Sequence, residues 1–280
     1  MPLTSTGELV TGARAAARAV FAFNVITVEH AEAIAAGAER AGSPAILQIS
    51  ENAVKFHGGN VAPLAAATAA VARASTARLS LHLDHIESTD LLHTAYAHEF
   101  SSVMFDASKL SYGDNVKATA AAARWGHERD IWVEAELGRV GGKSGDAHSP
   151  GVRTDPAEAA AYVAATGVDA LAVAVGSSHA MTERTAALDH ALITALRDAV
   201  GVPLVLHGSS GVPEPELRRA ITAGMAKINV GTALNSAYTG AVRAFLEAAR
   251  PTAVDPRRYL TSAREAMAET VAGFLGIAGG

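Results

Sequence analysis

LVLHGSSG, at residues 204–211, is a short apolar run that leads into a histidine and a turn of small residues. The same order recurs at Leu79 to Leu83, which precedes His85, and at Leu171 to Val175, which precedes His179. Continuous runs of Val, Leu and Ile are typical of strands buried in a parallel sheet, and the loops that leave their carboxyl ends gather on one face. The three histidines are therefore expected to converge.

Short apolar runs of this kind alternate with segments of helical period along nearly the whole chain. Helix starts are marked by Asp155-Pro156 before residues 157–165, and by Pro213 with two glutamates before residues 217–223. Eight strand-then-helix units favour a closed (β/α)8 TIM barrel, with an open doubly wound sheet as the alternative. The expected strands are Val20–Phe23, Ala45–Ile49, Leu79–Leu83, Ser102–Phe105, Ile131–Ala135, Leu171–Val175, Leu204–Leu206 and Lys227–Val230.

The chain of 280 residues is expected to form a single domain over residues 1–280, since α/β barrels commonly run to about 250 residues. Residues 138–154 are glycine-rich and polar, without helical or strand period, and are predicted to form a mobile active-site loop. Residues 255–277 follow the eighth unit and are predicted to add a C-terminal helical extension.

Composition indicates a globular protein with a small partner. Hydrophobic residues make up 49% of the chain and charged residues 18%, which is enough apolar material for a large core. The net charge of -5 comes without blocks of like charge, which argues against nucleic acid or a membrane surface as a partner. No run has membrane-spanning length, the amino end does not resemble a signal peptide, and cysteine is absent. A cytoplasmic location is expected.

The histidines at the strand ends predict a catalytic metal site. Three neutral imidazoles that leave one position open are the usual ligands of a catalytic zinc, whereas a structural zinc takes four protein ligands, often thiolates. Without cysteine a thiolate site is excluded. A lone histidine is more often a surface or hydrogen-bonded residue, and the histidines on predicted helices and loops are interpreted in that way. Zn²⁺ is expected on His85, His179 and His207.

The loops after the seventh and eighth strands have the composition of a phosphate site. Residues 208–211 read GSSG, and residues 229–232 read NVGT and open the predicted helix 233–243. Small residues let backbone N–H groups approach an anion, hydroxyls add donors, and a helix N-terminus adds its positive end. Barrels of this kind often hold phosphate with these two loops, so a phosphate site is predicted here.

Carboxylates lie at the ends of the third, fourth and fifth strands, on the face where the histidines are expected. Alternation along an extended segment is expected to point Asp84 away from His85. Asp84 is interpreted as a proton donor, with a carboxylate that orients a histidine as the alternative. Glu134 and Glu136 share one face of the fifth strand. Because inward carboxylates are costly without a cation, Glu136 and Asp106 are predicted to hold a second or alternate metal position.

At these positions the sequence resembles the class II, metal-dependent fructose-bisphosphate aldolases, in the branch that includes tagatose-bisphosphate aldolases. The resemblance extends from residues 22–24 to residues 255–257, which is nearly the whole chain. The matching motifs, in chain order, are HLDH at 82–85, VEAELG at 133–138, VDALAVA at 168–174, LVLHG at 204–208 and KINV at 227–230.

The resemblance implies zinc-dependent, reversible cleavage of fructose 1,6-bisphosphate to dihydroxyacetone phosphate and an aldehyde such as glyceraldehyde 3-phosphate. It also implies that Asp84 is the acid at the aldehyde oxygen, that a monovalent cation (Na⁺ or K⁺) binds near the phosphate, and that the chain forms a homodimer or homotetramer. The substrate-binding residues that it implies are Asn24, Ser50, Ala180, Gly208, Ser209, Ser210, Asn229, Val230, Gly231 and Thr232.

The sequence departs from this family around the aldehyde half of the pocket. Ser144 stands where the family has a glutamate that is a proposed base at C3, so Asp146 is predicted to replace it. Ala180 stands where glycine is usual, and Arg184 is the nearest counterpart of a family lysine. Two alternatives therefore stay open: an aldolase for tagatose 1,6-bisphosphate or another ketose phosphate, or a weakly active protein that binds metal and sugar phosphate.

Overall fold

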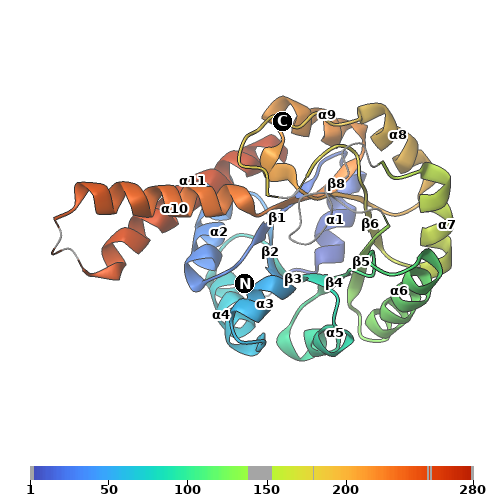
Figure 1. Ribbon diagram of the computed structural model, residues 1–280, viewed down its shortest axis with the longest axis horizontal. Coiled ribbons are helices and arrows are strands. Elements are labelled where there is room, and N and C mark those ends of the chain that lie inside the picture. The colour runs from blue at the N-terminus through green and yellow to red at the C-terminus, as the bar shows by residue number, and fades with distance from the viewer. Residues whose placement is uncertain (1–2, 138–152, 179, 251, 253, 279–280) are drawn as a thin grey trace.

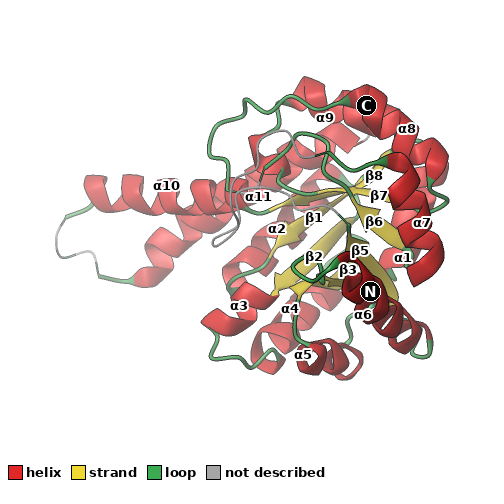
Figure 2. Cartoon of the chain, turned by 45° about the vertical axis from the view of Figure 1, so that its right-hand side comes forward, coloured by secondary structure: helices red, strands yellow, loops and turns green. Residues whose placement is uncertain are grey.

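The computed structural model describes residues 3–137, 153–178, 180–250, 252 and 254–278. These residues form a closed barrel of eight parallel strands in sequential order, surrounded by helices (Figure 1 and Figure 2). The predicted TIM barrel is confirmed, and the open doubly wound sheet is wrong. The strands are β1 (Val20–Asn24), β2 (Ala45–Ser50), β3 (Leu79–Ile86), β4 (Ser102–Phe105), β5 (Trp132–Glu136), β6 (Ala170–Ala172), β7 (Leu204–Leu206) and β8 (Met225–Val230).

The helices follow the strands and begin where the sequence supplies start signals. Asp155 caps α7 by accepting hydrogen bonds from the backbone N–H groups of Ala157 and Glu158, both at 2.9 Å. The helices are α1 (Thr6–Ala15), α2 (Val28–Ala41), α3 (Glu51–Phe56), α4 (Ala62–Ala74), α5 (Thr89–Thr94), α6 (Tyr112–His127), α7 (Pro156–Thr166), α8 (His190–Ala199), α9 (Glu214–Ala223), α10 (Thr232–Ala248) and α11 (Pro256–Ala278), with the short 3-10 helices η1 (Ala95–His98) and η2 (Ser209–Gly211).

The two faces of the barrel strands differ in polarity. The leucines of β3 at 79, 81 and 83 belong to the large apolar core between the strands and the helices. Ser80, His82 and Asp84, which alternate with them, are also buried and lie on the inner face. The barrel interior therefore contains polar groups that must find partners inside it.

Helix α1 closes the amino-terminal end of the barrel, a role that the sequence did not predict. Its Leu9, Val10 and Ala13 pack on apolar residues at the starts of the strands. The hydroxyl of Thr6 donates to Ser80 Oγ at 3.1 Å and accepts from Ser102 Oγ at 2.7 Å. These contacts of α1 cover the amino-terminal end of the barrel. The carboxyl-terminal end is therefore the open one.

The strands at the candidate site differ in length from the predicted ones. β3 continues through His85 to Ile86, with an irregularity in its pairing to β4 between Leu83 and Ile86. β6 ends at Ala172, because Ala174 beyond it exchanges hydrogen bonds with the backbone and hydroxyl of Thr154. Of the predicted active-site loop, residues 138–152 lie outside the described part of the chain.

The predicted C-terminal extension is α11, which packs against α2 and α10. Gly37 of α2 allows the close approach, since a Cβ atom there would lie 2.6 Å from Cβ of Val271 in α11. Together α10 and the start of α11 project from the barrel, at the left of Figure 1. Within the described residues, no helix combines the length and the apolar character needed to cross a membrane.

Candidate active site

A pocket of about 150 Å³ opens at the carboxyl-terminal end of the barrel. Most of the residues that the sequence singled out as ligands or substrate contacts surround it, because the parallel strands end on the same face. The lining residues are Asn24, Gln48, Asp84, His85, Ser178, Ala180, Gly208, Ser210, Asn229, Gly231, Thr232 and Asn235.

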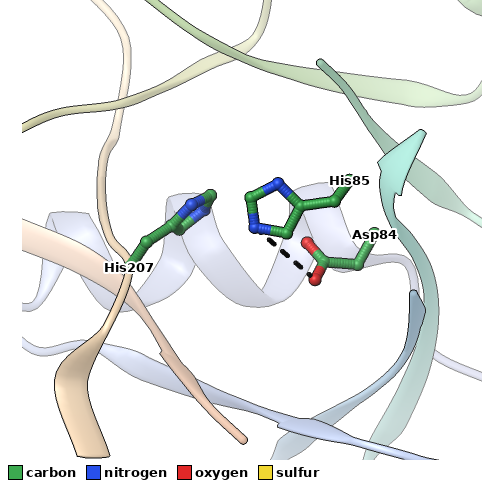
Figure 3. Close-up of side chains that lie close together, drawn as sticks. All are labelled: Asp84, His85 and His207. Atoms are coloured by element: carbon green, nitrogen blue, oxygen red, sulfur yellow. Dashed lines mark ion pairs between the residues drawn. The ribbon is translucent and has the colours of Figure 1, made fainter. Parts of the chain in front are cut away.

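Three side chains meet beside this pocket: Asp84 and His85 from β3, and His207 after β7 (Figure 3). They offer ligand atoms that all lie within 4.8 Å of one another. The imidazole rings of His85 and His207 have their centroids 4.7 Å apart, and Nε2 of His85 lies 4.0 Å from Oδ2 of Asp84. The spacing is that of a group that could hold one metal ion.

The backbone of His85 explains why two successive residues of a strand reach one site. Its φ of 50° lies in the left-handed region, which is uncommon for residues with a Cβ atom and is not the extended conformation of a strand. The expectation that strand alternation separates Asp84 from His85 is therefore wrong. The irregularity in β3 turns His85 toward the same side as Asp84.

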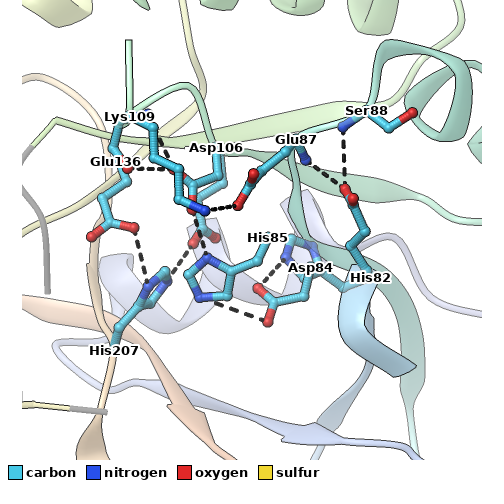
Figure 4. A network of polar contacts seen from close by, with 12 residues as sticks. His82, Asp84, His85, Glu87, Ser88, Asp106, Lys109, Glu136 and His207 are labelled. Atoms are coloured by element: carbon cyan, nitrogen blue, oxygen red, sulfur yellow. Dashed lines mark hydrogen bonds and ion pairs between the residues drawn. The ribbon is translucent and has the colours of Figure 1, made fainter. Parts of the chain in front are cut away.

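Each of these two histidines also contacts a carboxylate, and Figure 4 shows the one beside His85, which belongs to Asp106. Nδ1 of His85 lies 3.2 Å from Oδ2 of Asp106, and Nε2 of His207 lies 3.0 Å from Oε1 of Glu134. Asp106 is itself held by Ser108, whose backbone N–H and hydroxyl both donate to its Oδ1. Carboxylates in this position fix the orientation and the protonated nitrogen of ligand histidines.

A second group of possible ligands shares His85 with the first. His85, Asp106 and Glu136 also offer ligand atoms within 4.8 Å of one another, as expected for the predicted second or alternate position. Imidazole nitrogens and carboxylate oxygens suit a divalent metal such as zinc, so the donor set fits a catalytic metal. His179, the remaining predicted ligand, lies outside the described residues.

The charges inside the barrel favour an ionised Asp84. Burial raises the pKa of its carboxyl, but the neighbouring imidazoles, that of His85 foremost, hold the pKa well below its ordinary value. Burial, followed by the charge of Lys227, lowers the pKa of His82, so its imidazole is neutral at pH 7. Nδ1 of His82 lies 2.7 Å from Ser102 Oγ, while its Nε2 faces Asp84 Oδ1 at 3.7 Å.

A buried ion pair lies beneath His207. Nζ of Lys227 on β8 lies 2.8 Å from Oε2 of Glu134 on β5. Burial raises the pKa of Glu134, but the charge of Lys227 and the hydrogen bond from His207 outweigh it and lower the pKa to about 2. Glu134 is therefore a carboxylate at neutral pH.

The two predicted phosphate loops line the other side of the pocket. Gly208 has a φ of 67°, a conformation that suits glycine, and Ser210 Oγ accepts a hydrogen bond from the backbone of Ala233 at 3.1 Å. Gly231 lies at the start of α10, where a Cβ atom would come 3.1 Å from Cγ of Asn24. Backbone N–H groups at the start of this long helix are suited to an anion.

Asn229 presents a side-chain amide to the same pocket. It is only 7% exposed, and neither its nitrogen nor its oxygen has a hydrogen-bond partner among the residues that the structure describes. Buried polar groups are nearly always hydrogen-bonded in folded proteins. A bound ligand would supply the hydrogen-bond partners that this amide lacks. Asn229 was predicted to contact substrate, and its surroundings agree with that prediction.

Three of the residues predicted to contact substrate have partners within the protein. The hydroxyl of Ser50 caps α3 by accepting from Ala53, the hydroxyl of Ser209 donates to the carbonyl of Asn229, and the side chain of Val230 packs in the apolar core. Arg184, the nearest counterpart of the family lysine, lies over the ring of Phe274 and donates to the carbonyl of Val212.

Ala180 lines the pocket in a conformation that favours glycine. Its φ is 60°, and the left-handed region costs a residue with a Cβ atom about 1–2 kcal/mol. The exchange of the usual glycine for alanine therefore has a backbone cost at the edge of the site, as the sequence suggested.

Residues that the sequence did not single out complete the site. Gln48 donates to Oδ1 of Asn24 at 2.5 Å and is the one polar side chain inside the apolar run of β2, which is a usable signal. Asn235 follows Thr232 by three residues and so shares its helix face. Lys227 begins the KINV motif and is a charged residue in a predicted strand, but its partner could not be read from that strand. Ser178 had no comparable signal.

Comparisons with known proteins agree with this geometry. The family described as "Fructose-bisphosphate aldolase class-II" matches residues 4–279. The chain is 38% identical over 275 residues to a fructose-bisphosphate aldolase of Geobacillus stearothermophilus, covering 98% of this chain and 96% of that protein. The crystal structure of the YdjI aldolase of Escherichia coli K12 has a TM-score of 0.86 at 31% identity, covering 99% and 97% of the two chains. A fructose-bisphosphate aldolase structure from Campylobacter jejuni, 23% identical with a TM-score of 0.83 over 99% and 95% of the chains, shares the fold.

Proposed function

Because the chain belongs to the class II fructose-bisphosphate aldolase family, we propose that it cleaves fructose 1,6-bisphosphate reversibly to dihydroxyacetone phosphate and glyceraldehyde 3-phosphate, with zinc as its metal. It is a class II aldolase, a carbon–carbon lyase that acts on a sugar phosphate. The observation that carries the proposal is one pocket in which His85 and Asp84 face the loops around Gly208 and Gly231. A candidate metal site and a candidate anion site therefore line the same pocket, where one sugar phosphate could contact both.

His85 and His207, with His179 as the third ligand, would hold the catalytic Zn²⁺. When bound there, the metal supplies a Lewis acid that stabilises negative charge on the C2 carbonyl oxygen of the substrate. Asp106 and Glu136, together with His85, would hold a second or alternate position. Asp106 already contacts His85 in the structure, so it either orients this ligand or binds metal beside it.

The remaining residues bind and orient the substrate. Gly208, Ser210, Gly231 and Thr232 would surround the phosphate of the dihydroxyacetone half, with a monovalent cation nearby. The amide of Asn229 would meet the hydroxyls of the same half. Holding the phosphate and the carbonyl at fixed positions places the C3–C4 bond beside Asp84.

Asp84 would move the proton at the C4 oxygen. In the cleavage direction its carboxylate accepts the proton of the C4 hydroxyl as the C3–C4 bond breaks, and in the condensation direction it returns that proton to the aldehyde oxygen. The low pKa of Asp84 provides the charged form that the cleavage direction needs.

Turnover assays on a panel of ketose phosphates test the proposed substrate. The zinc-loaded protein is expected to cleave fructose 1,6-bisphosphate faster than tagatose 1,6-bisphosphate and fructose 1-phosphate, with dihydroxyacetone phosphate as the common product. A preference for another ketose phosphate would change the substrate but keep the reaction. Absence of cleavage across the panel by metal-loaded protein would favour the alternative of a protein that only binds metal and sugar phosphate.

The base at C3 is predicted to be Asp146, which lies outside the described residues. Asp146→Ala is expected to slow the exchange of the C3 proton of dihydroxyacetone phosphate by about 100-fold or more, because a base acts in that transition state. Ser144→Glu, which restores the residue of the family, is expected to preserve or raise the exchange. Deuterium exchange followed by NMR measures both, with the exposed Glu158→Ala as the control. Unchanged exchange in Asp146→Ala would place the base elsewhere, at water or His148.

Assembly and location are predictions of the same kind. A homodimer or homotetramer is proposed from the family, and sedimentation of the purified protein would determine which forms. The cytoplasmic location expected from the cysteine-free sequence stays a prediction.

A further inference from the structure

We propose that Glu134, paired with Lys227, is a positioning residue that holds His207 by its Nε2 and so leaves Nδ1 as the nitrogen for the metal. The inference rests on the proposed function, because it takes His207 as a ligand of the catalytic metal. Glu134 and Lys227 act through the histidine and do not touch the substrate.

The three residues form one chain of contacts across the barrel. Lys227 Nζ lies 2.8 Å from Glu134 Oε2, and Glu134 Oε1 lies 3.0 Å from His207 Nε2. They come from β8, β5 and the end of β7, and the side chains of all three are 0% exposed. Each oxygen of the carboxylate has its own partner, so the carboxylate cannot rotate without losing one of them.

The position of the acceptor decides which nitrogen of His207 carries its proton. A carboxylate accepts hydrogen bonds only, so the ring must carry hydrogen on Nε2, and a neutral imidazole then has its lone pair on Nδ1. Nδ1 lies on the side of Glu136, at 3.9 Å from its Oε2, where the candidate ligand groups lie. The lone pair is thereby aimed at the site before any metal arrives.

Stability alone gives little reason for this ion pair. Two charges withdrawn from water lose hydration, and the replacement of a buried pair by apolar residues of similar volume is often neutral or stabilising. Glu134 also differs from Asp106, the carboxylate behind His85. Asp106 belongs to a group that could hold metal itself, whereas Glu134 belongs to neither group found among the described residues. Orientation of His207 is the role that its contacts support.

Lys227 contributes by fixing the carboxylate. Without the ammonium group, Oε2 of Glu134 would be a buried acceptor without a charged donor, and the side chain could turn away from His207. With it, Oε1 stays directed at Nε2. Carboxylates that orient metal-ligating histidines typically contribute 10-fold to 100-fold in metal affinity, which sets the effect expected of this pair.

Two double variants separate the orientation of His207 from the charge of the ion pair. Glu134→Leu/Lys227→Met removes both charges and the acceptor for His207. Glu134→Gln/Lys227→Met removes the same two charges but retains a carbonyl oxygen that can accept from Nε2. The zinc affinity of each purified protein is measured by competition with a chelator, and far-UV circular dichroism reports the fold.

We expect the leucine double variant to bind zinc about 10-fold to 100-fold more weakly than the original protein, and the glutamine double variant to stay within about 3-fold of it. In the zinc-bound original protein, ¹⁵N–¹H correlation of the histidine rings is expected to show His207 with hydrogen on Nε2. Equal zinc affinity in both double variants and the original protein would overturn the inference, as would an equal loss in both or a His207 ring with hydrogen on Nδ1.

A third variant keeps the inference testable if the leucine variant does not fold. Glu134→Asp retains the charge but withdraws the carboxylate from His207 by one methylene, and is expected to weaken zinc binding while the fold is kept. Unchanged zinc affinity in this variant would contradict the positioning role. Failure of the proposed function is a separate result, because in that case the original protein itself would bind no zinc.

Discussion

His207→Ala is expected to abolish stoichiometric zinc binding and aldol turnover while the barrel stays folded. The ring is 0% exposed, and it is the only member of the candidate group with Asp84 and His85 that comes from outside β3. Without it, this group retains only Asp84 and His85, two successive residues of one strand, which cannot surround an ion. The apolar core between strands and helices is untouched, because His207 lies on the inner face of the barrel.

Metal analysis of the purified variant, together with turnover and circular dichroism, measures this effect. His93→Ala is the matched control, because His93 is an exposed histidine of α5 that contacts the ring of Trp125 and lies outside the pocket. The control is expected to keep both zinc and activity. Full metal content and activity in His207→Ala would show that the ligand assignment is wrong.

The parts of the site that follow from strand order were predictable from the sequence. A histidine directly after a buried apolar run lies at the carboxyl end of its strand, and a closed parallel barrel brings all such ends to one face. His207 and the loops around Gly208 and Gly231 are therefore where the sequence placed them. The same argument gave Glu134 and Glu136 a common inner face, because a strand alternates with a period of two.

Local backbone irregularity was not predictable in this way. His85 has a φ of 50°, and nothing in the motif HLDH announces that the strand alternation fails there. The apolar run at Leu171 to Val175 likewise predicted a longer β6 than forms, because Thr154, far away in sequence, takes over the hydrogen bonds of Ala174. Both differences are set by tertiary contacts, which a pattern within one strand does not contain.

Side-chain pairs between distant strands were also beyond the sequence. Glu134 was recognised as an inward carboxylate that needs a cation, but Lys227, its partner, lies on β8 and reaches it only across the closed barrel. Arg184 is a residue that the sequence did single out, but its contacts in the folded chain lie elsewhere. Its charge and position near His179 made it the nearest counterpart of a family lysine, and the folded chain places it over Phe274. Charge and spacing identify candidates, and the packing decides which of them reach the site.

Asp84→Ala is expected to lower the rate of cleavage of fructose 1,6-bisphosphate by about 100-fold to 10,000-fold, because a group that moves a proton in the transition state is lost. Zinc and dihydroxyacetone phosphate are expected to bind as before, since His85, His207 and the phosphate loops are unchanged. Exchange of the C3 proton of dihydroxyacetone phosphate should therefore survive better than cleavage, as it requires no proton transfer at the C4 oxygen.

The comparison of these two rates decides between the two roles that the geometry gives Asp84. Its carboxylate belongs with His85 and His207 to a group whose ligand atoms lie within 4.8 Å of one another, so it could bind the metal. It also lines the pocket, so it could act on the substrate. Asp84→Asn keeps the shape of the side chain and serves as the control for the space that alanine would leave beside His82. Loss of cleavage with exchange retained in both variants supports proton transfer at C4. Equal loss of cleavage and exchange, accompanied by loss of zinc, would instead assign Asp84 to the metal site, since both reactions depend on the metal but only cleavage depends on the C4 oxygen.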